Sequence, residues 1–171
     1  MLDGYNRRER ATTVFSNLVK LNMMGMTCFK ELCHGLPPIR FLQRLKDVII
    51  QHCHRLKVIF HTMDGLLPRE EICQTPLLSN LTSLVLESLP ELESIWKLQS
   101  THQYHASLRS IKAVRIHCCC KLKSIFSTCV AQSLLHLQQL NISDCGTLEQ
   151  VFDFPQEPAE LEVPLLSPFL L

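Results

Sequence analysis

The feature that most constrains the fold of this chain is a run of apolar residues that recurs five times with the same spacing. Within each copy, successive apolar positions lie 3, 2, 3, 3, 3 and 1 residues apart. Four clear copies begin at Leu45, Leu81, Ile111 and Leu137, and a weaker one begins at Leu18. No copy has a polar residue at any of these positions, although only 46% of the chain is hydrophobic. Such a repeat indicates stacked coils, because one copy alone cannot bury its apolar face.

The spacing within one copy predicts a strand followed by an arch. A gap of two places both side chains on the same face of a short strand, as for Leu140 and Ile142. The gaps of three that follow fit a chain that turns away while each third residue points inward. The closing pair, such as Ile125 and Phe126, fills the far side of the coil. This is the leucine-rich-repeat pattern, and it predicts a solenoid of about five repeats plus an unfinished sixth.

The predicted fold class is α/β, with a curved parallel sheet on the concave side of the solenoid and loops and short helices on the convex side. The copies start 27, 36, 30 and 26 residues apart. Two of these spacings exceed the usual repeat length of about 20–29 residues. We expect the extra residues on the convex side, as a helix within residues 127–136, a loop over residues 63–76 and a turn at residues 35–38.

Three segments are predicted along the chain. Residues 1–14 form a polar amino-terminal segment, residues 15–154 the leucine-rich-repeat domain, and residues 155–171 a linker with the start of a further repeat. The last assignment depends on residues 164–169, PLLSPF, which parallel residues 76–81, PLLSNL, in front of a predicted strand. Solenoids need polar capping repeats, so an unfinished apolar coil predicts a fragment or a truncated relative of a larger protein.

Charge and hydropathy exclude several classes of protein. Seventeen Lys and Arg face sixteen Asp and Glu, a formal net charge of +1, whereas a nucleic-acid binder carries a clustered basic excess. No apolar run approaches the ~18 residues that suggest a membrane span. The polar amino terminus is not followed by the apolar segment of a secretory signal. A cytoplasmic location is expected, in which the nine cysteines remain thiols.

Motifs for catalysis, cofactors and metals are absent from the sequence. There is no Gly-x-Ser-x-Gly, no His-Glu-x-x-His, and none of the five glycines is followed by the lysine of a phosphate-binding loop. Residues 118–120, CCC, and residues 52–54, HCH, invite a metal site, but adjacent side chains on a strand point in opposite directions. Cys53, Cys119 and Cys145 share one repeat position, which indicates core packing. The sequence therefore predicts no enzyme, no cofactor and no bound metal.

Three phrases of the repeats resemble a known family. They are LQQLNISDCGTLEQVF at residues 137–152, VRIHCCCKLKSIF at residues 114–126 and LVLESLPELESIW at residues 84–96. They are similar to the repeats of plant coiled-coil nucleotide-binding leucine-rich-repeat disease-resistance proteins. The resemblance implies a sensor region whose partner is a pathogen effector, a guarded host protein or a nucleotide-binding domain. Because the phosphate-binding loop is absent, this chain could supply only the recognition half of such a receptor.

The residues that alternate with the inward side chains are expected to face outward in rows across the sheet. A mixture of charged, amide and apolar side chains on such a surface suits protein recognition. The nine residues predicted to bind a protein partner are Asn22, Ile49, Gln51, Val85, Glu87, Arg115, His117, Asn141 and Ser143. Glu87 and His117 fall in one row and could form an exposed ion pair. A solvated face without a partner is the alternative interpretation.

Two other functions remain open. Leucine-rich-repeat substrate adaptors of ubiquitin ligases also carry cysteine at this repeat position. However, their repeats continue differently after the cysteine, and no F-box precedes the repeats in this sequence. A nonfunctional truncated remnant is the other alternative.

Overall fold

A computed structural model describes residues 17–32, 39–62, 76–98 and 107–153. Several predictions fall elsewhere. The polar segment at residues 1–14, the turn at residues 35–38, nearly all of the loop at residues 63–76 and the unfinished repeat at residues 155–171 lie outside the described residues.

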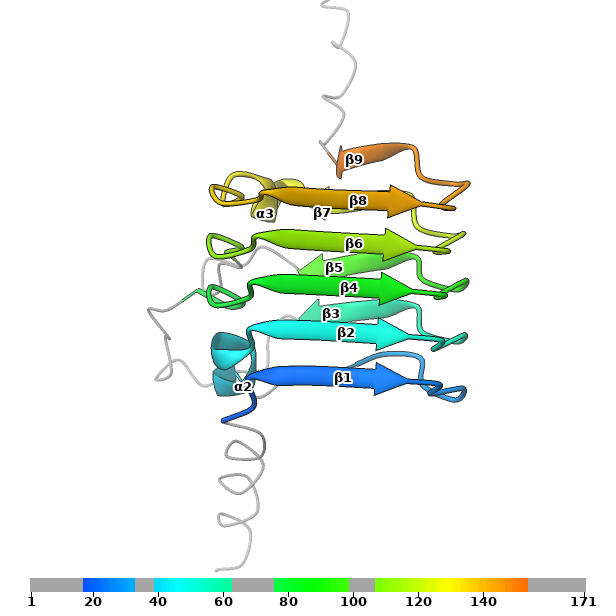
Figure 1. Cartoon of the computed structure of the whole chain (residues 1–171), viewed down its shortest axis with the longest axis horizontal. Helices are drawn as coiled ribbons and strands as arrows, with labels where there is room; N and C mark the ends of the chain where they lie inside the picture. Colours follow the sequence, from blue (N-terminus) through cyan, green and yellow to red (C-terminus); the bar gives the residue numbers. More distant parts are fainter. Residues whose placement is uncertain (1–16, 33–38, 63–75, 99–106, 154–171) are drawn as a thin grey trace, which may run out of the picture.

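A five-stranded parallel sheet, here called the large sheet, runs the length of the described molecule (Figure 1). Its strands lie side by side in chain order, and one comes from each predicted copy: β1 (Lys20–Met24), β2 (Asp47–Gln51), β4 (Ser83–Glu87), β6 (Ala113–His117) and β8 (Gln139–Ser143). Each strand pairs with the next over all five residues without an offset. The predicted parallel solenoid is confirmed.

The far side of the solenoid differs from the prediction of loops and short helices. Short parallel strands lie there instead: β3 (Val58–Thr62) pairs with β5 (Ser94–Leu98), and β7 (Ser124–Ser127) pairs with β9 (Gln150–Asp153). The closing pairs of the repeat form these strands, because aromatic and β-branched residues favour extended backbone and the neighbouring coil offers a partner.

Helix is scarce in the described residues. It is limited to α2 (Ile39–Arg44) and α3 (Thr128–Ala131), so α3 covers only part of the predicted helix at residues 127–136. The Ser133 hydroxyl donates a 2.7 Å hydrogen bond to the Val130 carbonyl and accepts a 2.8 Å hydrogen bond from the Leu108 amide. Such side-chain bonds to the backbone compete with continuation of the helix beyond one turn. The described part of the chain contains no helix that is long and apolar enough to cross a membrane.

The core fills the space between the large sheet and the far-side strands. Leu84 and Leu86 of β4 are completely buried, as is Cys119 after β6. In contrast, Leu140 and Ile142 of β8, the last strand of the large sheet among the described residues, are half-buried.

Aromatic rings stack on the far side of this core. The rings of Phe60 and Trp96 stack with centroids 5.0 Å apart, and those of Phe126 and Phe152 stack at 5.6 Å. The buried Trp96 indole donates a 2.7 Å hydrogen bond to the Ile125 carbonyl, and this bond links β5 to β7 across the break between the two small sheets.

Each strand of the large sheet is followed by one residue with left-handed backbone. We call this set the turn column, and its φ values lie between 53° and 68° at Gly25, His52, Ser88, Cys118 and Asp144. The amide of each of the first four donates to the carbonyl oxygen that ends the next strand, at 3.0–3.1 Å. The turn column therefore extends the ladder by one bond per coil. It also interrupts the alternation of side chains that extended backbone imposes.

Candidate functional site

The nine residues predicted to bind a partner lie in two neighbouring rows of the large sheet. We call the two rows together the outer face. The middle row aligns Asn22, Ile49, Val85, Arg115 and Asn141, and the edge row aligns Gln51, Glu87, His117 and Ser143. Strands about 4.8 Å apart bring these side chains into a continuous surface. The structure thus places all nine together.

The middle row has two aliphatic side chains at its centre and polar side chains on both sides of them. Asn22, Arg115 and Asn141 are exposed, whereas Ile49 and Val85 are half-buried between them. An aliphatic centre with a polar surround is the composition of many protein interfaces.

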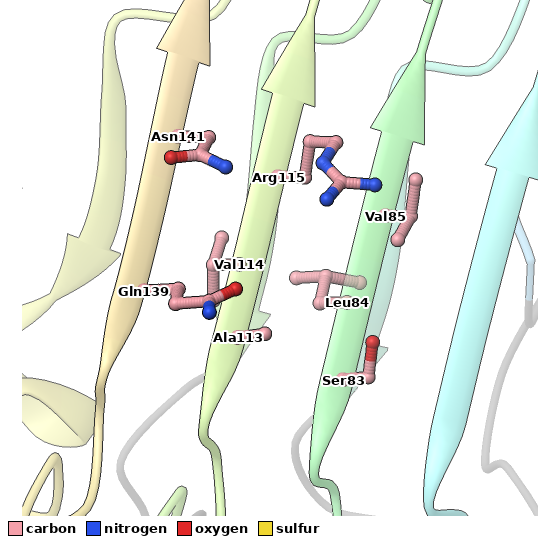
Figure 2. Close-up of a pocket in the computed structure, with 8 residues that line it drawn as sticks. All are labelled: Ser83, Leu84, Val85, Ala113, Val114, Arg115, Gln139 and Asn141. Atoms are coloured by element: carbon pink, nitrogen blue, oxygen red, sulfur yellow. The ribbon is translucent and has the colours of Figure 1, made fainter.

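A small hollow opens on this side of the sheet across β4, β6 and β8 (Figure 2). Eight residues line it: Ser83, Leu84, Val85, Ala113, Val114, Arg115, Gln139 and Asn141. The hollow exists because Ala113 offers only a methyl group between Ser83 and Gln139, its neighbours in register. Figure 2 shows the Arg115 guanidinium extending toward Val85 and the Gln139 amide extending toward Ala113. Hydroxyl, amide and guanidinium groups therefore lie around the small side chain of Ala113.

The charged side chains near the hollow differ in whether they have hydrogen-bond partners. Asp47 lies 3.3 Å from the Thr82 hydroxyl, and Glu87 accepts a 2.5 Å hydrogen bond from the Gln51 amide. The side chain of Arg115 makes no hydrogen bond or ion pair with any residue that the structure describes. No acidic residue lines the hollow. The guanidinium is thus available to an anionic group that approaches from solvent.

The predicted ion pair between Glu87 and His117 is wrong, although the two residues are aligned in register. Glu87 is bound by Gln51, and His117 Nδ1 lies 2.8 Å from the Ser143 hydroxyl and 3.1 Å from Asp144 Oδ2. The left-handed backbone of Asp144 is the reason, because it brings a carboxylate of the next coil beside the imidazole.

The three consecutive cysteines lie in three environments. Cys118 is half-buried with its Sγ 3.3 Å from His117 Nε2, Cys119 is fully buried, and Cys120 is exposed. Burial, followed by the nearby Asp144 carboxylate, raises the pKa of the Cys118 thiol. Burial raises the pKa of Cys119 to about 12. Cys53 and Cys119 are core residues, as their repeat position predicts, and Cys145 at the same position is half-buried.

The side chains of His117 and Cys118 do not diverge, contrary to the expectation for adjacent residues of a strand. The positive φ of Cys118 brings its sulfur to the same side as the imidazole. Ligand atoms of His117, Cys118 and Asp144 lie within 4.8 Å of one another. This cluster was not predicted from the sequence, because the repeat pattern does not single out the turn column. A signal was present, since Gly, His and Asp, which adopt positive φ more readily than most residues, occupy three of its five positions.

Comparison with known proteins agrees with this architecture. The family model described as plant disease resistance protein RPS2-like, leucine-rich repeats, matches residues 4–159, which is most of the chain. Neither the curated proteins nor the solved structures gave a match. The matched region includes every strand of the large sheet and the turn column that follows them. The chain therefore belongs to the RPS2-like leucine-rich-repeat family of plant disease resistance proteins.

Proposed function

We propose that this chain is the protein-recognition module of a plant immune receptor and that it binds its partner through the outer face. The observation that carries the proposal is the alignment of the outward residues, which makes one surface from five separate coils. Family membership supports the class of function. The proposed partner is a pathogen effector, a guarded host protein or a nucleotide-binding domain, and the module itself performs no catalytic step.

Arg115 and the hollow give this surface a preferred chemistry. An unpaired guanidinium binds a carboxylate through two parallel hydrogen bonds, and arginine is enriched among the residues that dominate interfaces. The hydroxyl of Ser83 and the amides of Gln139 and Asn141 lie around the same hollow. We therefore propose that an acidic side chain of the partner enters the hollow, while the partner's aliphatic groups cover Ile49 and Val85.

The proposal also includes the number of repeats and the cellular location. The module consists of five leucine-rich repeats, one for each strand of the large sheet. We propose that it acts in the cytoplasm, a reducing compartment in which the nine cysteines of the sequence would remain thiols.

The test compares two charge reversals on opposite sides of the solenoid. Arg115→Glu places a carboxylate beside the hollow, whereas Lys97→Glu makes the same change on β5 of the far side, where Lys97 is exposed. The complete chain is used to capture partners from infected leaf extract, and each purified partner is then titrated against the three proteins. Circular dichroism confirms that both variants fold.

We expect Arg115→Glu to weaken binding by about tenfold or more, since loss of a central arginine contact costs about 1–2 kcal/mol or more. Lys97→Glu should leave the affinity unchanged. Equal affinities for the wild type and Arg115→Glu would remove the hollow from the proposal. If Val85→Glu were also without effect, the outer face would not be the binding surface.

A further inference from the structure

We propose that His117, Cys118 and Asp144 form a binding site for a divalent transition metal such as zinc. The three residues come from two successive coils, at the end of β6 and just after β8. One ligand atom from each residue lies within 4.8 Å of the other two. The imidazole lies between its partners, with Cys118 Sγ 3.3 Å from Nε2 and Asp144 Oδ2 3.1 Å from Nδ1, so a single ring nitrogen would bind the ion. The site lies at the carboxyl ends of β6 and β8 and shares His117 with the edge row of the outer face. The proposed entry of an acidic side chain into the hollow does not involve it.

Backbone geometry brings the three side chains together. Cys118 and Asp144 occupy equivalent positions in the turn column, with φ of 53° and 54°. The amide of Cys118 donates to the Ser143 carbonyl at 3.1 Å, which fixes one coil against the next at this point. The positions of the two ligands thus follow from the solenoid ladder rather than from a long loop.

The donor set indicates which ion fits. One imidazole nitrogen, one thiolate and one carboxylate oxygen suit zinc and its neighbours, whereas magnesium and calcium take oxygen ligands. In a tetrahedral zinc site with bonds of about 2.0–2.3 Å, ligand atoms lie about 3.5 Å apart. The three ligand atoms, which lie within 4.8 Å of one another, would close toward this value by rotation of the side chains around the ion. Water would complete the coordination.

Access and local charge also favour a cation. The side chains of His117 and Asp144 are 40% and 68% exposed, so an ion can enter and both groups can reorient around it. Glu87, in register with His117 on the neighbouring strand, adds a second carboxylate near the site. On binding, the Cys118 thiol loses its proton to solvent and a sulfur–metal bond forms; the metal keeps its oxidation state.

The experiment uses the complete, reduced chain and cobalt(II) as a spectroscopic substitute for zinc. A thiolate ligand gives a sulfur-to-cobalt charge-transfer band in the near ultraviolet, and tetrahedral coordination gives intense visible bands. We expect both bands to saturate at one ion per chain, and zinc to displace the cobalt.

Two variants test proposed ligands, and a third serves as the control. Cys118→Ser should abolish the charge-transfer band, and it should fold because serine occupies the same left-handed position at Ser88. Asp144→Asn keeps a residue that tolerates positive φ and should weaken binding by about tenfold or more. Cys120→Ser is the matched control, since this exposed neighbour lies outside the cluster.

The outcomes separate a site formed by these residues from adventitious binding by other thiols. Loss of the band in Cys118→Ser but not in Cys120→Ser, with weaker binding by Asp144→Asn, supports the proposal. A band that survives in Cys118→Ser, or the absence of a saturable thiolate band in the wild type, overturns it. No partner protein is needed, so failure here leaves the proposed function untouched.

Discussion

Among individual residues, the run from Cys118 to Cys120 shows how position decides chemistry. The three thiols are adjacent in sequence, but one lies beside an imidazole, one is in the core and one is in solvent. The repeat position alone separates Cys119 from its neighbours and could be identified from sequence. The approach of Cys118 to His117 could not be predicted, because it depends on a left-handed backbone conformation. Cysteine is not one of the residue types enriched in that conformation.

The thiols should differ sharply in their reactivity. In native protein at neutral pH, iodoacetamide should modify the exposed Cys28 and Cys120 rapidly, whereas the buried Cys53 and Cys119 remain protected. Because the thiolate is the reactive form, raising the Cys119 pKa from 9.0 to about 12 lowers its thiolate fraction about a thousandfold. Peptide mass spectrometry at timed intervals measures each site. Modification of Cys119 as fast as Cys120 would contradict the assignment of Cys119 to the core.

Among the secondary-structure elements, the repeated unit is a five-residue strand followed by one residue with left-handed backbone. The strand was predictable because a gap of two between apolar residues has one structural solution, and the observed register agrees with it from β1 to β8. The far-side strands were not predictable. Gaps of three are compatible with a loop or a helix, and only pairing with the neighbouring coil selects the extended form.

Glycine at position 25 avoids the backbone strain that the left-handed turn imposes on other residues. Gly25 has φ of 68°, and a β-carbon added there would meet nothing within 4 Å, so Gly25→Ala should cost about 1 kcal/mol of folding free energy through backbone strain alone. Gly146→Ala is the matched control, since that site is equally open and lacks the positive φ. It should be neutral or slightly stabilising. Urea unfolding followed by circular dichroism measures both, and equal stabilities of the two variants would argue against strain at Gly25.

The whole molecule is a stack in which each coil contacts mainly its neighbours. The tie between β5 and β7 illustrates this, because one indole hydrogen bond from Trp96 joins two small sheets that share no ladder. Sequence periodicity predicted the stacking but not this break, which depends on how one large ring packs against the next coil. Stability should therefore vary along the stack according to how many neighbours a coil has.

Two leucines in the same row test this dependence on neighbours. Leu84 lies between Val48 and Val114 in register and is fully buried, whereas Leu140 has Val114 on one side and is half-buried. Leu84→Ala should lower the free energy of unfolding by about 3 kcal/mol through lost contacts and a cavity. Leu140→Ala should cost about 1 kcal/mol, because part of that side chain is already in water. Equal losses in urea unfolding would mean that other residues cover β8.

The unbroken register has a consequence for how such a molecule can change. The repeat starts are separated by 26 to 36 residues, yet all four strand pairings align residue for residue. Differences in length are therefore absorbed between coils and leave the rows aligned. A coil can therefore be duplicated, exchanged or lengthened as one unit, and the outward side chains of the neighbouring coils keep their positions. Variation in what the surface presents is thus uncoupled from variation in the scaffold that presents it.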